Sequence, residues 1–144
     1  MARNKAALAA EVWKRMFAFL MKTSPRRTKI LARMGLTPND SRALSALEVT
    51  AGRTMRSLAD EWGCDASNAT WIVDRLEKRG LVERRAKPGD RRVKLVVLTA
   101  AGVKTRQRLI EGMYEAPAEL LLFPRARLEA LRKSLPDARD DRGS

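Results

Sequence analysis

The side chains best suited to chemistry stand together after Asp65, on a segment whose apolar residues repeat with a helical period. An asparagine can bond the N6 and N7 atoms of adenine together, an arginine can fork onto guanine, and a hydroxyl can serve a base edge or a phosphate. We expect Asn68 and Arg75 to read bases, assisted by three neighbours on the same face: Ser67, Thr70 and Trp71. The alternative is a solvated helix face, and any one of these residues can instead contact the nucleic-acid backbone.

A second group of suitable side chains is the basic stretch of residues 75–94. It holds nine Lys or Arg against three acids, so its balance of +6 is nearly half of the chain's formal charge of +13. A charge run is usually only a solvated face. On a hairpin beside a candidate recognition helix, however, it is placed to reach phosphates and the negative potential of a narrow minor groove. The candidates on this hairpin are Arg91, Arg92 and Lys94.

Two short amphipathic helices joined by a tight turn are predicted to position the first group. Gly63 ends the first helix, Asp65 can cap the second, and Gly80 follows the second helix. The apolar residues at i, i+3, i+4 and i+7 are Met55, Leu58, Ala59 and Trp62 in the first helix, and Ala69, Ile72, Val73 and Leu76 in the second. These stripes predict that the two helices pack together.

The period then changes from helical to alternating, which predicts a hairpin with strands at 81–85 and 92–97. Val93, Leu95 and Val97 would form its apolar face, opposite Arg92 and Lys94. Between the strands, Lys87-Pro88-Gly89-Asp90 places Pro and Gly where a type II turn needs them. The hairpin tip is therefore predicted to be basic and stiff.

Five segments together resemble the MarR family of bacterial transcriptional regulators. They are Leu36-Thr37-Pro38, Leu58-Ala59-Asp60, residues 73–84 (VDRLEKRGLVER), Asp90-Arg91-Arg92 and residues 98–102 (LTAAG). The resemblance implies a mainly α fold with a small β-hairpin wing (α+β), a winged helix-turn-helix whose N- and C-terminal helices form a homodimer. It also implies a DNA contact region at the wing, where Asp90 matches the family's acid; we expect Asp90 to orient Arg92 through a charge-assisted hydrogen bond.

This layout divides the chain into N-terminal dimerisation helices (1–36), a DNA-binding lobe (37–99), C-terminal dimerisation helices (100–136) and a disordered tail (137–144). Two N-terminal helices are expected, at 5–22 and from Ser24-Pro25 to Met34, and the next is expected to run from Thr37-Pro38 to Ala51-Gly52. Beyond the wing, we expect helices at 100–116 and after Phe123-Pro124.

The first predicted helix carries more apolar surface than an end segment normally has. Trp13 and Phe17 widen its stripe, which predicts burial in a dimer interface or core. A ligand pocket lined by these two aromatic side chains is the alternative.

Several classes of function have little support in the composition. The chain has no histidine and one cysteine, Cys64, so a disulfide within the chain is impossible and a metal site is not expected; Cys64 is expected to be a small buried filler. No nucleophile with a base partner and no phosphate loop is present, so we expect no enzyme and no cofactor. A pI near 11 suggests a polyanionic binding partner, which is DNA or, with less support, an anionic membrane surface. Without a membrane span or signal peptide, the protein is expected in the cytoplasm.

Two functional hypotheses remain. One is a dimeric, sequence-specific repressor that binds a near-palindromic operator in double-stranded DNA and is released by a small aromatic or phenolic ligand, as the resemblance implies. The other is an architectural or weakly specific DNA-binding protein of the same shape without an effector.

Overall fold

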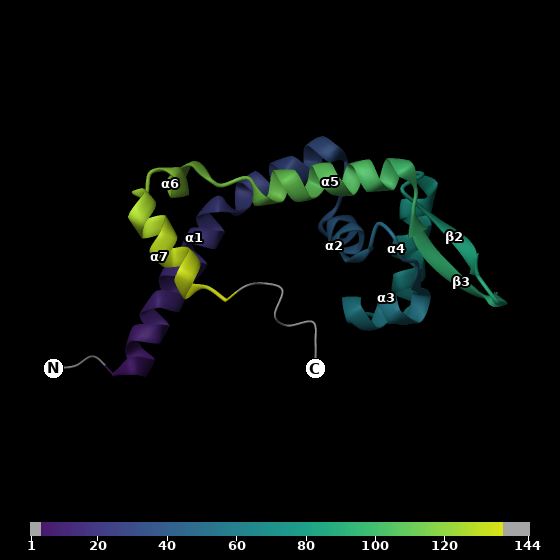
Figure 1. Cartoon of the computed structure of the whole chain (residues 1–144), viewed down its shortest axis with the longest axis horizontal. Coiled ribbons are helices and arrows are strands. Elements are labelled where there is room, and N and C mark those ends of the chain that lie inside the picture. Colours follow the sequence, from purple (N-terminus) through teal and green to yellow (C-terminus); the bar gives the residue numbers. More distant parts are fainter. Residues whose placement is uncertain (1–3, 137–144) are drawn as a thin grey trace. The chain divides into compact units, whose positions relative to one another are not determined.

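The computed structural model describes residues 4–136, which fall into two compact units (Figure 1). The first ends at Tyr114 and the second begins at Glu115. The first unit holds a three-stranded sheet among helices, which confirms the predicted mainly α fold with a small β-hairpin. The predicted disordered tail at 137–144 lies outside the described residues.

Helix α1 (Lys5–Met34) runs through the predicted break at Ser24-Pro25. The expectation of two helices was wrong because Pro25 removes only one backbone donor. In the same turn, the Thr23 hydroxyl donates to the carbonyls of Phe19 and Leu20, at 3.0 and 3.2 Å. The helix ends at Gly35, whose φ of 63° lies in the left-handed region that glycine adopts without strain.

Helix α2 (Pro38–Ala46) begins with a capping box. The Thr37 hydroxyl accepts from the Asp40 N–H, and the Asp40 carboxylate accepts from the Thr37 N–H. The helix ends five residues before the predicted end at Ala51, because the chain turns back and forms strand β1 (Arg53–Thr54). Gly52 is therefore not a helix end. A Cβ there would lie 2.8 Å from the Leu95 Cβ, so glycine permits close approach to the sheet.

Helices α3 (Met55–Trp62) and α4 (Ala66–Lys78) form the predicted helix-turn-helix. Gly63 ends α3 with a φ of 62°, and Asp65 caps α4. All four residues of the predicted stripe on α4 are buried, as are three of the four on α3, while Met55 is half-buried. The predicted periodicity is thus confirmed.

Strands β2 (Val82–Lys87) and β3 (Asp90–Leu98) form the hairpin, and β3 is the central strand between β1 and β2. Gly89, with φ 84°, occupies the position where a type II turn requires a positive value. The predicted apolar face was only partly right. The residues of β3 buried in the core are Val96 and Leu98, whereas the expected Val93, Leu95 and Val97 are half-buried. The base of the strand is covered on both faces, partly by Gly52.

The core of the first unit joins α2, α3, α4 and the sheet to the C-terminal half of α1 and to helix α5 (Ala100–Tyr114). Leu44, Leu58 and Leu76 are completely buried at its centre, and Leu109 of α5 also belongs to it. Thr99 caps α5 by accepting from the Gly102 N–H at 3.0 Å. Cys64 is half-buried against the core, which agrees with the expected filler role.

The second unit contains two helices, α6 (Ala118–Leu121) and α7 (Arg125–Ser134). The helix predicted after Phe123-Pro124 is confirmed as α7, while the single turn of α6 was not predicted. Within residues 4–136, no helix is both long and apolar enough to cross a membrane, and no cluster of three metal-binding side chains occurs.

Gly102 provides a test of the joint between the hairpin and α5. A Cβ at this position would lie 1.9 Å from the Leu81 carbonyl oxygen, so the backbone must shift. We expect Gly102→Ala to lower the free energy of unfolding by about 1–3 kcal/mol, measured by urea denaturation.

Gly112→Ala, in the same helix, is the matched control. Its Cβ would meet the Ile30 side chain at 3.2 Å, a contact that a small side-chain shift relieves. The gain in helix propensity should keep this variant within about 1 kcal/mol of the wild type. Equal losses in both variants would contradict the account of the joint.

Candidate nucleic-acid interface

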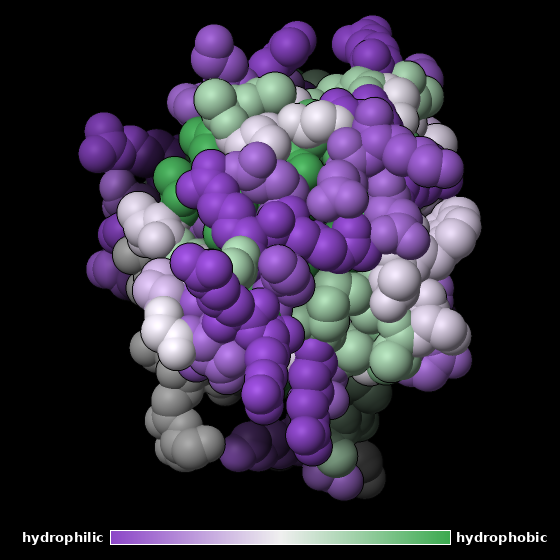
Figure 2. Space-filling view, turned by 90° about the vertical axis from the view of Figure 1, so that its right-hand side faces the viewer, coloured by the Kyte–Doolittle hydropathy of each residue, from purple (hydrophilic) through white to green (hydrophobic). Residues whose placement is uncertain are grey.

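Helix α4 turns a continuous polar face away from the core. With 3.6 residues per turn, the centre of this face lies opposite the buried stripe. The residues at its centre, all exposed, are Ser67, Trp71, Asp74 and Lys78. The predicted Asn68 and Arg75 border it on one side and Thr70 on the other. Figure 2 looks at this end of the first unit, where hydrophilic side chains predominate.

The N-terminal turn of α4 is fixed by Asp65. One carboxylate oxygen, Oδ1, accepts from the Asn68 N–H at 2.7 Å and from the Ser67 hydroxyl at 2.9 Å. The Asn68 N–H, and after it the Ser67 hydroxyl, lower the pKa of the Asp65 carboxyl. The Thr70 hydroxyl donates to the Ala66 carbonyl at 2.8 Å. Ser67 and Thr70 therefore offer mainly acceptor oxygens to a ligand, whereas the side-chain amide of Asn68 has no partner within residues 4–136.

Arg75 is held by the protein itself. Its Nη2 lies 3.0 Å from Oδ2 of Asp40, whose side chain is only 1% exposed. The guanidinium also lies over the Trp71 ring, with Cζ 5.6 Å from the ring centroid. Base contact by Arg75 stays a prediction. The ion pair argues against it, because Nη2 of the guanidinium is already paired with Asp40 and only part of the group could reach a base.

The hairpin tip carries the predicted wing residues. Arg91, Arg92 and Lys94 are all exposed. Since side chains alternate along a strand, Lys94 continues the face that buries Val96 and Leu98 nearer the base. Arg91 and Arg92 lie between Asp90 and Lys94, where the pairing with β2 shifts register. The Asp90 carboxylate accepts from the backbone N–H of Arg92 at 3.1 Å. Asp90 therefore shapes the turn, and the expected bond to the Arg92 guanidinium was wrong.

Arg84 ties the hairpin to α4. Its two terminal nitrogens reach Asp74 at 2.6 Å and Glu77 at 3.0 Å. The pairing offsets part of the negative charge of the two acids, and it joins the helix to the wing. Sequence reasoning counted Arg84 only as general positive charge.

Arg79 ties the end of α4 to the junction between α1 and α2. Its guanidinium donates to the Gly35 carbonyl at 2.6 Å and to the Met34 carbonyl at 3.1 Å. These carbonyls belong to the C-terminal end of α1, where a cation is favourable. Of the cations predicted on α4, Arg79 and Arg75 thus serve structure within the lobe.

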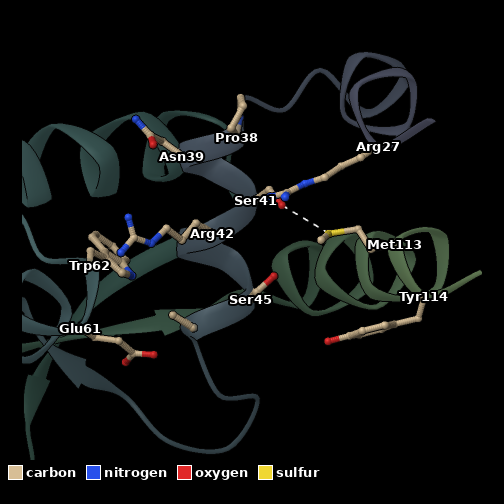
Figure 3. Close-up of a pocket in the computed structure, with 11 residues that line it drawn as sticks. Arg27, Pro38, Asn39, Ser41, Arg42, Ser45, Glu61, Trp62, Met113 and Tyr114 are labelled. Atoms are coloured by element: carbon tan, nitrogen blue, oxygen red, sulfur yellow. Dashed lines mark hydrogen bonds between the residues drawn. The ribbon is translucent and has the colours of Figure 1, made fainter. Parts of the chain in front are cut away.

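A hollow of about 470 Å³ lies among α1, α2, α3 and α5 of the first unit (Figure 3). Arg27 and Arg42 supply positive charge, and Trp62 and Tyr114 supply aromatic surface. Ser41 donates a hydrogen bond to the Met113 sulfur at 3.6 Å across the gap between α2 and α5. The buried Trp62 Nε1 has no hydrogen-bond partner in the part of the chain that the structure describes.

Trp13 and Phe17, the predicted ligand residues, do not line this hollow. Their rings lie 6.4 Å apart on the exposed stripe of α1, and the two side chains are 61% and 51% exposed. Their position agrees better with the dimer alternative than with a pocket in a single chain.

Two residues that organise the site were missed. Asp40 belongs to a capping-box pattern, Thr37-x-x-Asp40. The pattern accounts for the hydrogen bonds between Asp40 and Thr37, but it does not indicate that the carboxylate is buried beside Arg75. Arg53 bonds to Ser57 and pairs with Glu61 at 2.6 Å, which holds β1 on α3; the two-residue strand has no sequence pattern of its own.

Two paired helices followed by a basic hairpin define the winged helix-turn-helix class of proteins. Residues 34–93 match the model of the MarR family. This match supports the MarR family for this segment of the chain.

Similar proteins agree with this assignment. The transcriptional repressor MprA of Escherichia coli is 37% identical over 78 residues, 53% of this chain and 44% of that protein. A MarR family protein from Bacillus stearothermophilus has a solved structure that is 25% identical, covers 92% of both chains and gives a TM-score of 0.75. A mutant of S. aureus MepR, solved bound to an oligodeoxyribonucleotide, is 20% identical, with a TM-score of 0.68 over 86% of this chain and 91% of that one, and shows the shared fold. The chain spans about half the length of the curated relatives it matches.

The Asp65 cap predicts a pH dependence of stability. Because folding lowers its pKa, the ionised cap stabilises the fold fully above about pH 4, the ordinary range of the group, and this contribution disappears as the pH falls through the lowered folded value. Asp65→Asn keeps a capping side chain without the charge. The variant should be less stable than the wild type at pH 7, and the difference in urea midpoint should shrink as the pH falls below about 4. A difference independent of pH would show that the charge contributes nothing.

Proposed function

We propose that this chain is a dimeric, sequence-specific DNA-binding transcription regulator that acts as a repressor in the cytoplasm and has no catalytic activity. The observation that carries the proposal is that the polar face of α4 and the basic hairpin tip belong to one lobe, joined by Arg84. The names of its relatives support it, since MprA is a repressor and the MepR mutant binds an oligodeoxyribonucleotide.

In the proposed complex, two copies place their α4 helices in successive major grooves of a near-palindromic operator, and the wings reach the flanking minor grooves. Asn68 is the foremost candidate for base contact because its amide is exposed and has no partner within residues 4–136. The wing candidates Arg91, Arg92 and Lys94 would neutralise phosphates or enter the minor groove.

Dimerisation is supported by the surface of α1. Apolar side chains recur along one side of its N-terminal two thirds, each at least 38% exposed: Leu8, Val12, Trp13, Met16, Phe17, Leu20 and Met21. A stripe of this size on a monomer is unusual unless a partner covers it. We therefore assign Trp13 and Phe17 to the interface between two copies.

We further propose that a small aromatic or phenolic acid releases the DNA by binding in the hollow of Figure 3. Arg27 and Arg42 would receive its carboxylate, and Trp62 and Tyr114 its ring. A screen of aromatic acids against the preformed protein–DNA complex tests this; release by none of them would leave a regulator without such an effector.

Selection of bound sites from random duplexes is the decisive experiment for the function. The expected result is a near-palindromic motif with half-sites about one helical turn apart. A pool without a motif would support an architectural protein instead, and absence of binding in dilute salt would refute the proposal.

The wing makes a quantitative prediction. Arg92→Ala removes one phosphate contact, so the slope of log K against log salt should become shallower by about 0.9, with weaker binding to every sequence. Arg15→Ala is the control: it removes the same charge from α1, at the end of the first unit away from the hairpin (Figure 1), where Arg15 pairs with Glu11. Equal slopes for Arg92→Ala and the wild type would remove the wing from the interface.

The apolar stripe of α1 predicts the oligomeric state. Phe17→Glu places a charge in the proposed interface and should yield a monomer at micromolar concentration by light scattering. Lys14→Glu, a change at another exposed position of the same helix outside the apolar stripe, should remain dimeric. A wild-type monomer would contradict the proposal directly.

A further inference from the structure

Trp71 is out of place on a polar helix face. It lies at the centre of the outward face of α4 and is 54% exposed, whereas its neighbours there, Ser67, Asp74 and Lys78, are hydrophilic. An indole offers one hydrogen-bond donor and a large apolar surface. The apolar group that a base pair presents in the major groove is the 5-methyl of thymine.

The Trp71 indole also contacts a side chain that is itself held in place. The Arg75 guanidinium lies against it, and the buried Asp40 carboxylate holds that guanidinium at 3.0 Å. Oδ2 of Asp40 additionally accepts the Thr37 N–H at 2.8 Å, so the carboxylate is itself fixed at the start of α2. A side chain oriented before binding loses less conformational entropy when it meets its ligand.

The surroundings of Trp71 leave room for a base edge. A surface hollow of about 360 Å³ borders the ring, lined also by Asp74, Arg75, Lys78 and Arg79. Asp74 is paired with Arg84, which offsets its repulsion of a nearby phosphate. The exposed Lys78 remains beside the hollow as a cation for the DNA backbone.

We propose that Trp71 reads the 5-methyl group of a thymine in each half-site, and that Arg75, fixed by Asp40, is a positioning residue for this indole and not a guanine reader. The proposal rests on the proposed DNA binding and adds to it a base and a chemical group.

Single replacements of thymidine by deoxyuridine in the selected duplex test the proposal, because they delete only the methyl group. At one thymine per half-site, the wild type should lose about three- to fivefold in affinity, the range that burial of one methyl group implies. Trp71→Ala should bind the thymine duplex more weakly and show no difference between thymine and uracil. Val49→Ala, which truncates another apolar side chain of 54% exposure, should keep the wild-type difference.

The positioning role of Arg75 is tested with a separate variant. Asp40→Asn retains an acceptor for the Thr37 N–H but lacks the charge that holds Arg75. It should reduce the thymine preference while leaving the salt slope unchanged. If circular dichroism shows that this variant is unfolded, Arg75→Lys replaces it, because lysine keeps the charge beside Asp40 but has no planar group against the indole.

The outcomes separate the two proposals. If the wild type binds its selected duplex but no deoxyuridine position depends on Trp71, the methyl reading is wrong and the regulator stands. If full thymine preference survives in folded Asp40→Asn or Arg75→Lys, the positioning role is wrong. If the wild type binds no duplex at all, the proposed function itself fails.

Discussion

The ion pair between Asp40 and Arg75 is the interaction on which the arrangement of the lobe depends. A carboxylate that is 1% exposed is costly to leave without a counter-ion, so Arg75 must stay beside it. The same carboxylate completes the capping box of α2. One buried charge therefore fixes both the start of α2 and the rotation of α4 about its axis. The polar face of α4 points outward because its opposite stripe is buried and because this contact permits one rotation.

The arginines of the lobe divide into two groups with different tasks. Arg75, Arg79 and Arg84 join α4 to α2, to the end of α1 and to the hairpin, each through contacts of 2.6 to 3.1 Å. Arg91 and Arg92 are exposed at the hairpin tip. The formal charge of the chain thus overstates the positive charge available to a polyanion, because some of its arginines are paired with groups of the protein itself. Charge counting along a sequence cannot separate the two groups, whereas burial and pairing do.

Local patterns predicted most of the fold and part of the candidate site. The stripes of α3 and α4, the Asp65 cap and the Pro88-Gly89 turn depend on neighbours within a few residues, so periodicity was sufficient. The end of α2 and the existence of β1 depend on contacts between distant segments, such as Gly52 against Leu95, and no local pattern reports these. For the same reason the outward position of Asn68 and Trp71 on α4 was predicted, but the partner of Arg75, 35 residues away in the chain, was not.

The closed base of the hairpin has a consequence for how such a lobe can vary. Thr99 bonds to the carbonyls of Gly80 and Leu81, and Gly102 lies against the same backbone, so the two ends of the hairpin are fastened together where they leave the helices. Changes in length near Pro88 would therefore alter how far the tip extends without disturbing the core. Exchange of the tip would therefore change the reach of the hairpin and leave the scaffold beneath it unchanged.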